Sequence, residues 1–145
     1  MAFLRILKDK SQLVGTAYIE LLPGKYTGTC WNRGSLFMDE DTFGFFEGIV
    51  RTHLPDYDHY AFTEASVSLW KPVIERFKGF ATELRAARSP AELPSDIHFF
   101  MNDTEHRFTE DFSSNVQLLQ EVASDLIGWL EAQSKQHETI TILGL

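Results

Sequence analysis

The residue types best suited to acid–base or metal chemistry are concentrated in one short segment. It contains two histidines, two carboxylates and two tyrosines within eight residues: His53, Asp56, Tyr57, Asp58, His59 and Tyr60. Imidazole and carboxylate groups can ligate a metal ion or move protons. The two histidines are six residues apart, however, which would put them on different faces of a helix, so they do not form a helical zinc pair. We therefore interpret the segment as a solvated loop with aromatic anchors.

A run of acids, Asp39, Glu40 and Asp41, resembles the start of a calcium-binding loop. The resemblance fails because Phe43 stands where such a loop needs an oxygen ligand and Val50 stands where it needs its final glutamate. Carboxylates at the start of a helix are stabilised by the positive end of the helix dipole. The three acids therefore predict a helix N-terminus rather than a metal site.

A second polar cluster, Asn102–His106, contains a carboxylate and a histidine that could act together as an acid and a base. A turn formed by Asn102 and Asp103 explains the same residues more simply. An enzyme or ligand-binding protein would need such groups to converge in one pocket. In this alternative, which we call the pocket alternative, the residues that would converge are His53, Asp56, His59, His98 and His106.

None of the common catalytic or cofactor-binding motifs occurs in the sequence. The glycine-rich phosphate and dinucleotide loops, the helical zinc-protease motif, the nucleophile elbow and the paired-cysteine redox motif are all absent. We therefore expect no enzymatic activity, no metal and no cofactor. Catalytic groups can also be assembled from distant positions, so the pocket alternative stays open.

The elements that would position these residues follow from the hydrophobic periodicity. The chain has 145 residues, which suits a single domain over 1–145. Alternation and turn signals predict a β-hairpin over 12–31, a short strand over 35–38 and further strands over 97–101 and 139–143. The helical period predicts three main helices over 39–53, 68–88 and 113–134. The expected fold class is α+β with an antiparallel sheet.

The apolar stripes of the three predicted helices should form the core. The residues expected to be buried are Phe46, Ile49, Trp70, Ile74, Phe77, Leu119, Leu126, Ile127 and Leu130. The turn Pro23-Gly24 should connect the two arms of the hairpin. Cys30 is the single cysteine of the chain and cannot form an internal disulfide, which fits a reducing compartment.

The charge balance restricts the partners. The chain has 13 basic and 21 acidic residues, a net charge of -8, and residues 34–70 alone carry seven acidic side chains and one basic one. This balance argues against binding to nucleic acid or to anionic membranes and favours a basic protein partner. No long apolar stretch or signal peptide is evident, so we expect a cytoplasmic protein.

The combination of a hairpin, an acidic helix, the loop Asp56–Tyr60 and an amphipathic helix that begins near Trp70 resembles small bacterial immunity proteins over roughly residues 12–85. The resemblance implies a cytosolic protein that tightly binds a cognate toxin, and many such toxins are basic nucleases. Aromatic anchors and carboxylates suit such an interface. The predicted partner-binding residues are Asp39, Glu40, Asp41, Asp56, Tyr57, Asp58 and Tyr60. A third possibility, a homo-oligomeric adaptor or structural protein, would require a large exposed apolar patch.

Overall fold

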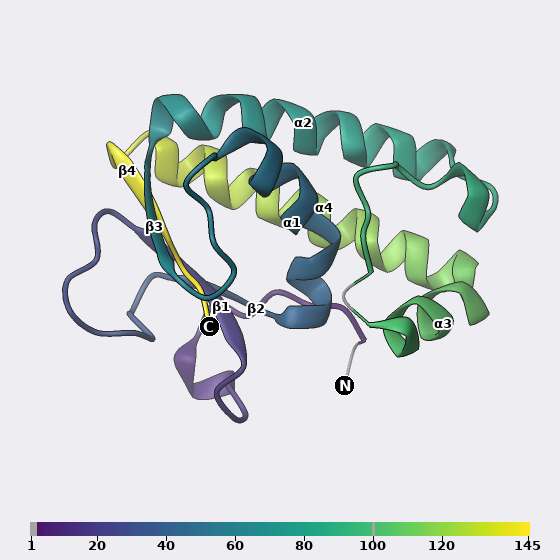
Figure 1. The fold of residues 1–145 in the computed structure, drawn as a ribbon, viewed down its shortest axis with the longest axis horizontal. Helices are drawn as coiled ribbons and strands as arrows, with labels where there is room; N and C mark the ends of the chain where they lie inside the picture. Colours follow the sequence, from purple (N-terminus) through teal and green to yellow (C-terminus); the bar gives the residue numbers. More distant parts are fainter. Residues whose placement is uncertain (1–2, 100) are drawn as a thin grey trace.

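In the computed structural model, which describes residues 3–99 and 101–145, four strands form one antiparallel sheet. The strands are β1 (Tyr18–Pro23), β2 (Leu36–Asp39), β3 (Phe62–Ser66) and β4 (Thr139–Leu143). Their order across the sheet is β2-β1-β4-β3. The last strand of the chain thus lies between the first strand and β3, as Figure 1 shows. The expected α+β class with an antiparallel sheet is confirmed.

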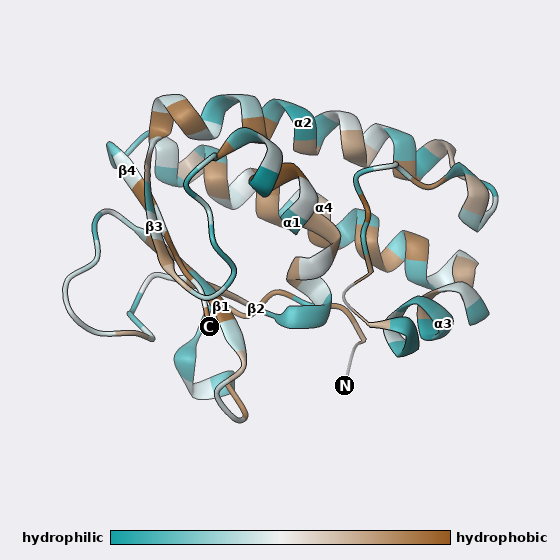
Figure 2. Ribbon diagram, in the orientation of Figure 1, coloured by the Kyte–Doolittle hydropathy of each residue, from teal (hydrophilic) through white to brown (hydrophobic). Residues whose placement is uncertain are grey.

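Within the described residues, four α-helices accompany the sheet: α1 (Glu40–His53), α2 (Val67–Ala86), α3 (Asn102–Glu110) and α4 (Phe112–Ser134). The two long helices, α2 and α4, lie side by side (Figure 1). The three predicted helices correspond to α1, α2 and α4, and their ends agree within two residues. Hydrophobic and hydrophilic bands alternate along α2 in Figure 2, which is the pattern that the helical period predicted.

Helix α3 was not predicted, because its first two residues were interpreted as a turn. The helix begins at Asn102, and Asp103 and Glu105 lie in its first turn, where the helix dipole stabilises acids. Only Thr104 and Phe108 of this helix are buried. This short and polar helix contains only one large apolar residue, so the sequence shows no apolar stripe along it, and the packing of Phe108 fixes its position.

The predicted hairpin over 12–31 is wrong in its second arm. Strand β1 pairs with β2, which the sequence had indicated only as a short third strand, and residues 24–35 form a loop between them. Gly28 and Trp31 have φ angles of 105° and 63°, which an extended strand does not allow. The β-favouring residues of this segment therefore lie in a curved loop and not in a strand.

One predicted strand is absent from the described residues, and one observed strand was not predicted. Residues 97–99 of the predicted strand 97–101 have no regular structure, and Phe100 lies outside the described residues. The ring of Phe99 packs instead against Phe45 and Phe108. Strand β3 occupies a segment that the sequence suggested was the end of a loop. Its buried residues are Thr63 and Ala65, while Phe62 is exposed. Its sequence therefore lacks the alternation of large apolar and polar residues that indicates a half-buried strand.

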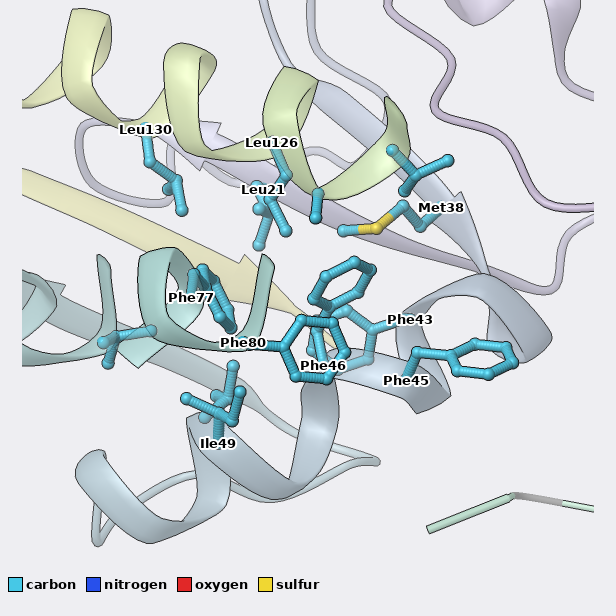
Figure 3. Close-up of a cluster of buried hydrophobic side chains, with 14 of the residues drawn as sticks. Leu21, Met38, Phe43, Phe45, Phe46, Ile49, Phe77, Phe80, Leu126 and Leu130 are labelled. Atoms are coloured by element: carbon cyan, nitrogen blue, oxygen red, sulfur yellow. The ribbon is translucent and has the colours of Figure 1, made fainter. Parts of the chain in front are cut away.

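The core lies between the helices and one face of the sheet. Ile19 and Leu21 of β1, Met38 of β2 and Ile142 of β4 all point to this face. Figure 3 shows the aromatic rings of α1 and α2 meeting Leu21, Met38 and the leucines of α4. Eight of the nine predicted core residues are buried, and Ile127 is partly buried against the same cluster.

None of the helices in the described part of the chain combines the length and the apolar character that a bilayer crossing requires.

Candidate functional site

The face of the sheet that the helices do not cover is only partly covered by other segments of the chain. Near β2 this face is covered by the N-terminal segment, where Leu7 packs with Tyr18 and Phe37 in a small second core. At β3 the covering is incomplete, and Phe62, Glu64 and Ser66 are exposed. The ring of Tyr26, from the loop 24–35, contacts Phe62 with 4.8 Å between the ring centroids.

A groove of about 700 Å³ opens on this face, across the ends of β1, β4 and β3. Its lining includes Glu20, Cys30, Trp31, Tyr60, Phe62 and Leu145. We call it the aromatic groove. Tyr60 is 70% exposed and Phe62 is 46% exposed, which is unusual for such large rings. An exposed cluster of aromatic side chains beside a concave surface is typical of a site for another molecule.

Glu20 fixes the wall of the groove. Its carboxylate is on β1, only 2% of the residue is exposed, and it accepts hydrogen bonds from the backbone N–H groups of Trp31 and Asn32 at 2.6 and 2.9 Å. The side chains of Asn32 and Ser35 donate two more. These bonds explain the unusual loop: the carboxylate gathers the N–H groups that the positive φ of Trp31 turns inward.

The charge of Glu20 is balanced by hydrogen bonds alone, because no Lys or Arg in the described part of the chain forms an ion pair with it. The charge of Glu20 also affects the neighbouring Cys30. Partial burial raises the pKa of the Cys30 thiol, and the charge of Glu20 raises it further. The groove is therefore electronegative at its base, and Cys30 stays a neutral thiol that is a poor nucleophile.

His59, in the loop between α1 and β3, is held between two carboxylates. Its Nδ1 lies 2.5 Å from Glu47 Oε2 and its Nε2 lies 2.9 Å from Glu40 Oε2, and both acids are on α1. Carboxylates only accept, so the imidazole donates from both nitrogens as the charged form. Burial by itself lowers the pKa of His59, but the hydrogen bonds and charges of Glu47 and Glu40 outweigh it and raise the pKa.

Tyr57 belongs to the same cluster. Its hydroxyl donates to Glu47 at 2.5 Å, and only 7% of the residue is exposed. Burial, together with the hydrogen bond to Glu47, raises the pKa of Tyr57 well above its usual range. The guanidinium of Arg51 lies over the Tyr57 ring and 3.7 Å from the same carboxylate. The cluster ties the loop to α1 and leaves His59 no lone pair with which to act as a base.

The predicted partner-binding residues fall into two groups. Asp39 caps α1 by accepting from the N–H of Thr42, and Asp41 accepts from the hydroxyl of Thr104 on α3. Together with Glu40 and Tyr57, these residues make bonds within the fold. The second group is exposed and consists of Asp56, Asp58 and Tyr60.

The residues of the pocket alternative do not meet in the aromatic groove. Among the described residues that line it, none is a histidine and none is Asp56. His53 contacts the carbonyl oxygen of Ile49 within its own helix, and His106 is exposed on α3. Within the described residues, no three His, Cys, Asp or Glu side chains are grouped so that they could hold a metal ion.

Comparison with known proteins identifies no relative. No family model, no curated protein and no solved structure matches the chain. Function therefore has to be argued from the surface itself.

The sequence predicted Tyr60, Asp56 and Asp58 as partner-binding residues, and this stays a prediction. It did not indicate the other residues that line the aromatic groove. Trp31 lines the groove and Tyr26 contacts Phe62, and both belong to a segment that was interpreted as a strand. Phe62 begins a strand that was not predicted. The signal that could have found them is the density of aromatic residues beside glycines in 24–35, which is typical of a shaped loop rather than of a hairpin arm.

Proposed function

We propose that this chain is a non-enzymatic protein-binding domain that neutralises a basic partner, in the manner of an immunity protein and its toxin. The binding surface is the outward acidic loop, Asp56 and Asp58, together with Tyr60 and the aromatic groove beside it. The observation that carries the proposal is the exposure of Tyr60 and Phe62 at the edge of a groove with a buried carboxylate at its base.

Charge supports a basic partner. The chain has a net charge of -8, and the carboxylates of Asp56 and Asp58 are exposed in the same loop as Tyr60. Complementary charge speeds the encounter of two proteins, while aromatic residues in the centre of an interface supply most of the binding energy. A tyrosine flanked by carboxylates combines the two contributions in one loop.

The loop is also preorganised. Its backbone carbonyl at His59 accepts from the N–H of Leu145 at 3.0 Å, and Ala61 accepts from Gly144. Asp58 caps the N–H of Tyr60 at 2.8 Å. With His59 pinned to α1, the loop loses little conformational entropy when a partner binds, which supports tight binding.

The test is capture of the tagged chain's partner from its native host, followed by binding kinetics at several salt concentrations. We expect a basic partner whose association slows as salt is added. Tyr60→Ala should weaken binding by at least roughly tenfold, mainly through faster dissociation, as expected for a central aromatic residue. Replacing Asp56 and Asp58 by Asn should mainly lower the association rate.

Matched controls are available elsewhere on the surface. Leu69 on α2 is an exposed apolar residue, and Asp103 and Glu105 on α3 are an exposed pair of acids. Leu69→Ala, and the double replacement of Asp103 and Glu105 by amides, should leave binding nearly unchanged. An acidic partner, or a partner that docks away from both the acidic loop and the aromatic groove, would contradict the proposal.

A further inference from the structure

The two edges of the sheet differ in how their backbone groups are satisfied. At the β2 edge, Leu7 and Phe37 exchange two backbone hydrogen bonds of 2.9 and 2.7 Å, so the N-terminal segment closes that edge. Edge strands that stay open present a row of unpaired N–H and C=O groups that can accept a further strand. The other edge of the sheet is β3.

The register of β3 shows which of its backbone groups are used. Ala61 accepts from Gly144, and Val67 donates to Glu138, at the two ends of the pairing with β4. In an antiparallel pair the bonding residues alternate, so the odd-numbered residues face β4. The N–H and C=O groups of Phe62 and Glu64 therefore point away from β4, and no hydrogen bond within the described part of the chain uses them.

The exposed side chains of Phe62 and Glu64 lie on the face of the sheet that the helices leave open. Phe62 also lines the aromatic groove. A strand added beside β3 would thus place its alternate side chains next to the groove. In strand addition, backbone bonds supply affinity and such side-chain pockets supply specificity.

From these observations we infer that the β3 edge binds an extended segment of the basic partner, which adds to the sheet as a strand beside Phe62 and Glu64. The inference rests on the proposed function and deepens it, because it specifies how the partner is held. Lysine or arginine opposite Glu64 forms a favourable cross-strand pair. The acidic loop Asp56–Tyr60 directly precedes β3, so it lies near the start of that strand.

A second copy of this chain fits the edge less well. Antiparallel pairing of two β3 strands about their central residue would place Glu64 directly opposite its own copy. Like charges opposite each other destabilise a strand pair. The net charge of -8 on each copy adds to the repulsion.

The sharpest test is Glu64→Pro. Proline removes one N–H group, and at this position that group points away from β4, so the sheet itself keeps its bonds. The variant should unfold at nearly the temperature of the unsubstituted chain. Ala65→Pro is the matched control. The backbone N–H group of Ala65 faces β4, so the loss of that N–H group should strongly destabilise the fold. Glu64→Lys keeps the N–H group and reverses the charge.

The probe is a synthetic peptide of alternating lysine and valine, with an alternating glutamate and valine peptide as its control. Amide resonances of the full chain are followed by nuclear magnetic resonance. With the lysine peptide we expect the largest shifts and slower hydrogen exchange at Phe62 and Glu64. In Glu64→Pro, which has no amide at position 64, both effects should disappear at Phe62. Glu64→Lys should reverse the preference between the two peptides.

Equal binding of the lysine peptide to Glu64→Pro and to the unsubstituted chain would overturn the inference. So would shifts confined to the helices, or a dimer of the chain through β3 that excludes the peptide. Once the partner is captured, two variants distinguish strand addition at β3 from the proposed function. If it binds Glu64→Pro normally while Tyr60→Ala weakens it, strand addition fails and the proposed function stands. If Tyr60→Ala has no effect, the proposed surface fails.

Discussion

The Nδ1 atom of His59 lies 2.5 Å from the Oε2 atom of Glu47, which joins the acidic loop to the middle of α1. The other ring nitrogen contacts Glu40 in the first turn of the same helix. One charged imidazole therefore connects the loop to two positions on α1 that lie about two turns apart. Its protonation should control how firmly the loop is held.

Stability should fall as the pH rises above the ordinary His59 pKa of 6.5. Because Glu47 and Glu40 raise the pKa of His59 in the folded chain, the folded state keeps a proton that the unfolded state has lost. The stabilisation is complete below pH 6.5 and is lost as the pH rises through the folded pKa. The free energy of unfolding should decline by at most about 1.4 kcal/mol per pH unit in this window.

Urea unfolding of the full chain between pH 5.5 and 9 measures this dependence, and His59→Gln should flatten it. His106→Gln is the control, because that histidine is exposed on α3 and its loss should leave the curve unchanged. A His59→Gln curve with the same slope as the unsubstituted chain would contradict the assignment.

Gly48 should not tolerate a side chain. A Cβ atom built there would lie 2.5 Å from the backbone oxygen of Asp96, and Asp96 is held in place by the guanidinium of Arg76. Because neither the backbone nor the ion pair can yield easily, Gly48→Ala should destabilise the fold by roughly 1–3 kcal/mol. Chemical denaturation measures the loss.

Gly128 provides the opposite case for the same substitution. It lies within α4, and a Cβ atom there would meet nothing within 4 Å among the described residues. Gly128→Ala should therefore stabilise the chain by about 0.5–1 kcal/mol, through helix propensity alone. Equal effects of the two substitutions would show that Gly48 and Asp96 are not in close contact.

The long elements could be predicted because their sequence patterns are local. The stripes around Phe46, Phe77 and Leu126 repeat over several turns, and the caps and acids at Asp39 mark where α1 begins. The core positions followed from the same stripes. Ile127 was included in error, because it lies at the border of its stripe and is only partly buried.

What the sequence could not predict depends on distant contacts. The course of the loop 24–35 is set by Glu20, whose four hydrogen bonds reach 11 to 15 residues along the chain. The burial of Tyr57 is set in the same way by Glu47. Both glutamates read as ordinary surface acids, since nothing local marks a carboxylate that collects hydrogen bonds inside a fold.

Thr63→Val should stabilise the chain. The Thr63 hydroxyl is buried on the core side of β3 and has no hydrogen-bond partner among the described residues. An unsatisfied buried hydroxyl costs roughly 1–3 kcal/mol, and valine has nearly the same shape and a higher tendency to form strands. We expect a gain of about 1 kcal/mol in the free energy of unfolding.

Thr141 is the matched control on the neighbouring strand. It is also buried, but its hydroxyl donates to the carbonyl oxygen of Gly24 at 2.7 Å. Thr141→Val should therefore destabilise the chain by about 1–3 kcal/mol, because it leaves that bond unmade. Destabilisation of similar size by both substitutions would mean that Thr63 is satisfied after all.

Cys30 should react slowly with thiol reagents, and Glu20 should be one cause. Partial burial, and then the charge of Glu20, raise the pKa of the Cys30 thiol, so little thiolate is present near neutral pH. Glu20→Gln removes the charge and keeps one acceptor oxygen, which can serve Asn32 and Ser35 at the Oε2 position, while the N–H of Trp31 loses its acceptor at the Oε1 position. The apparent pKa from the pH dependence of the thiol reaction should then fall, and the rate near pH 8 should rise.

Ser35→Ala is the control that separates the effect of charge from the effect of loop order, since it removes one hydrogen bond to Glu20 and leaves the charge in place. If Ser35→Ala accelerates the reaction as much as Glu20→Gln does, loosening of the loop rather than the field of Glu20 controls the thiol.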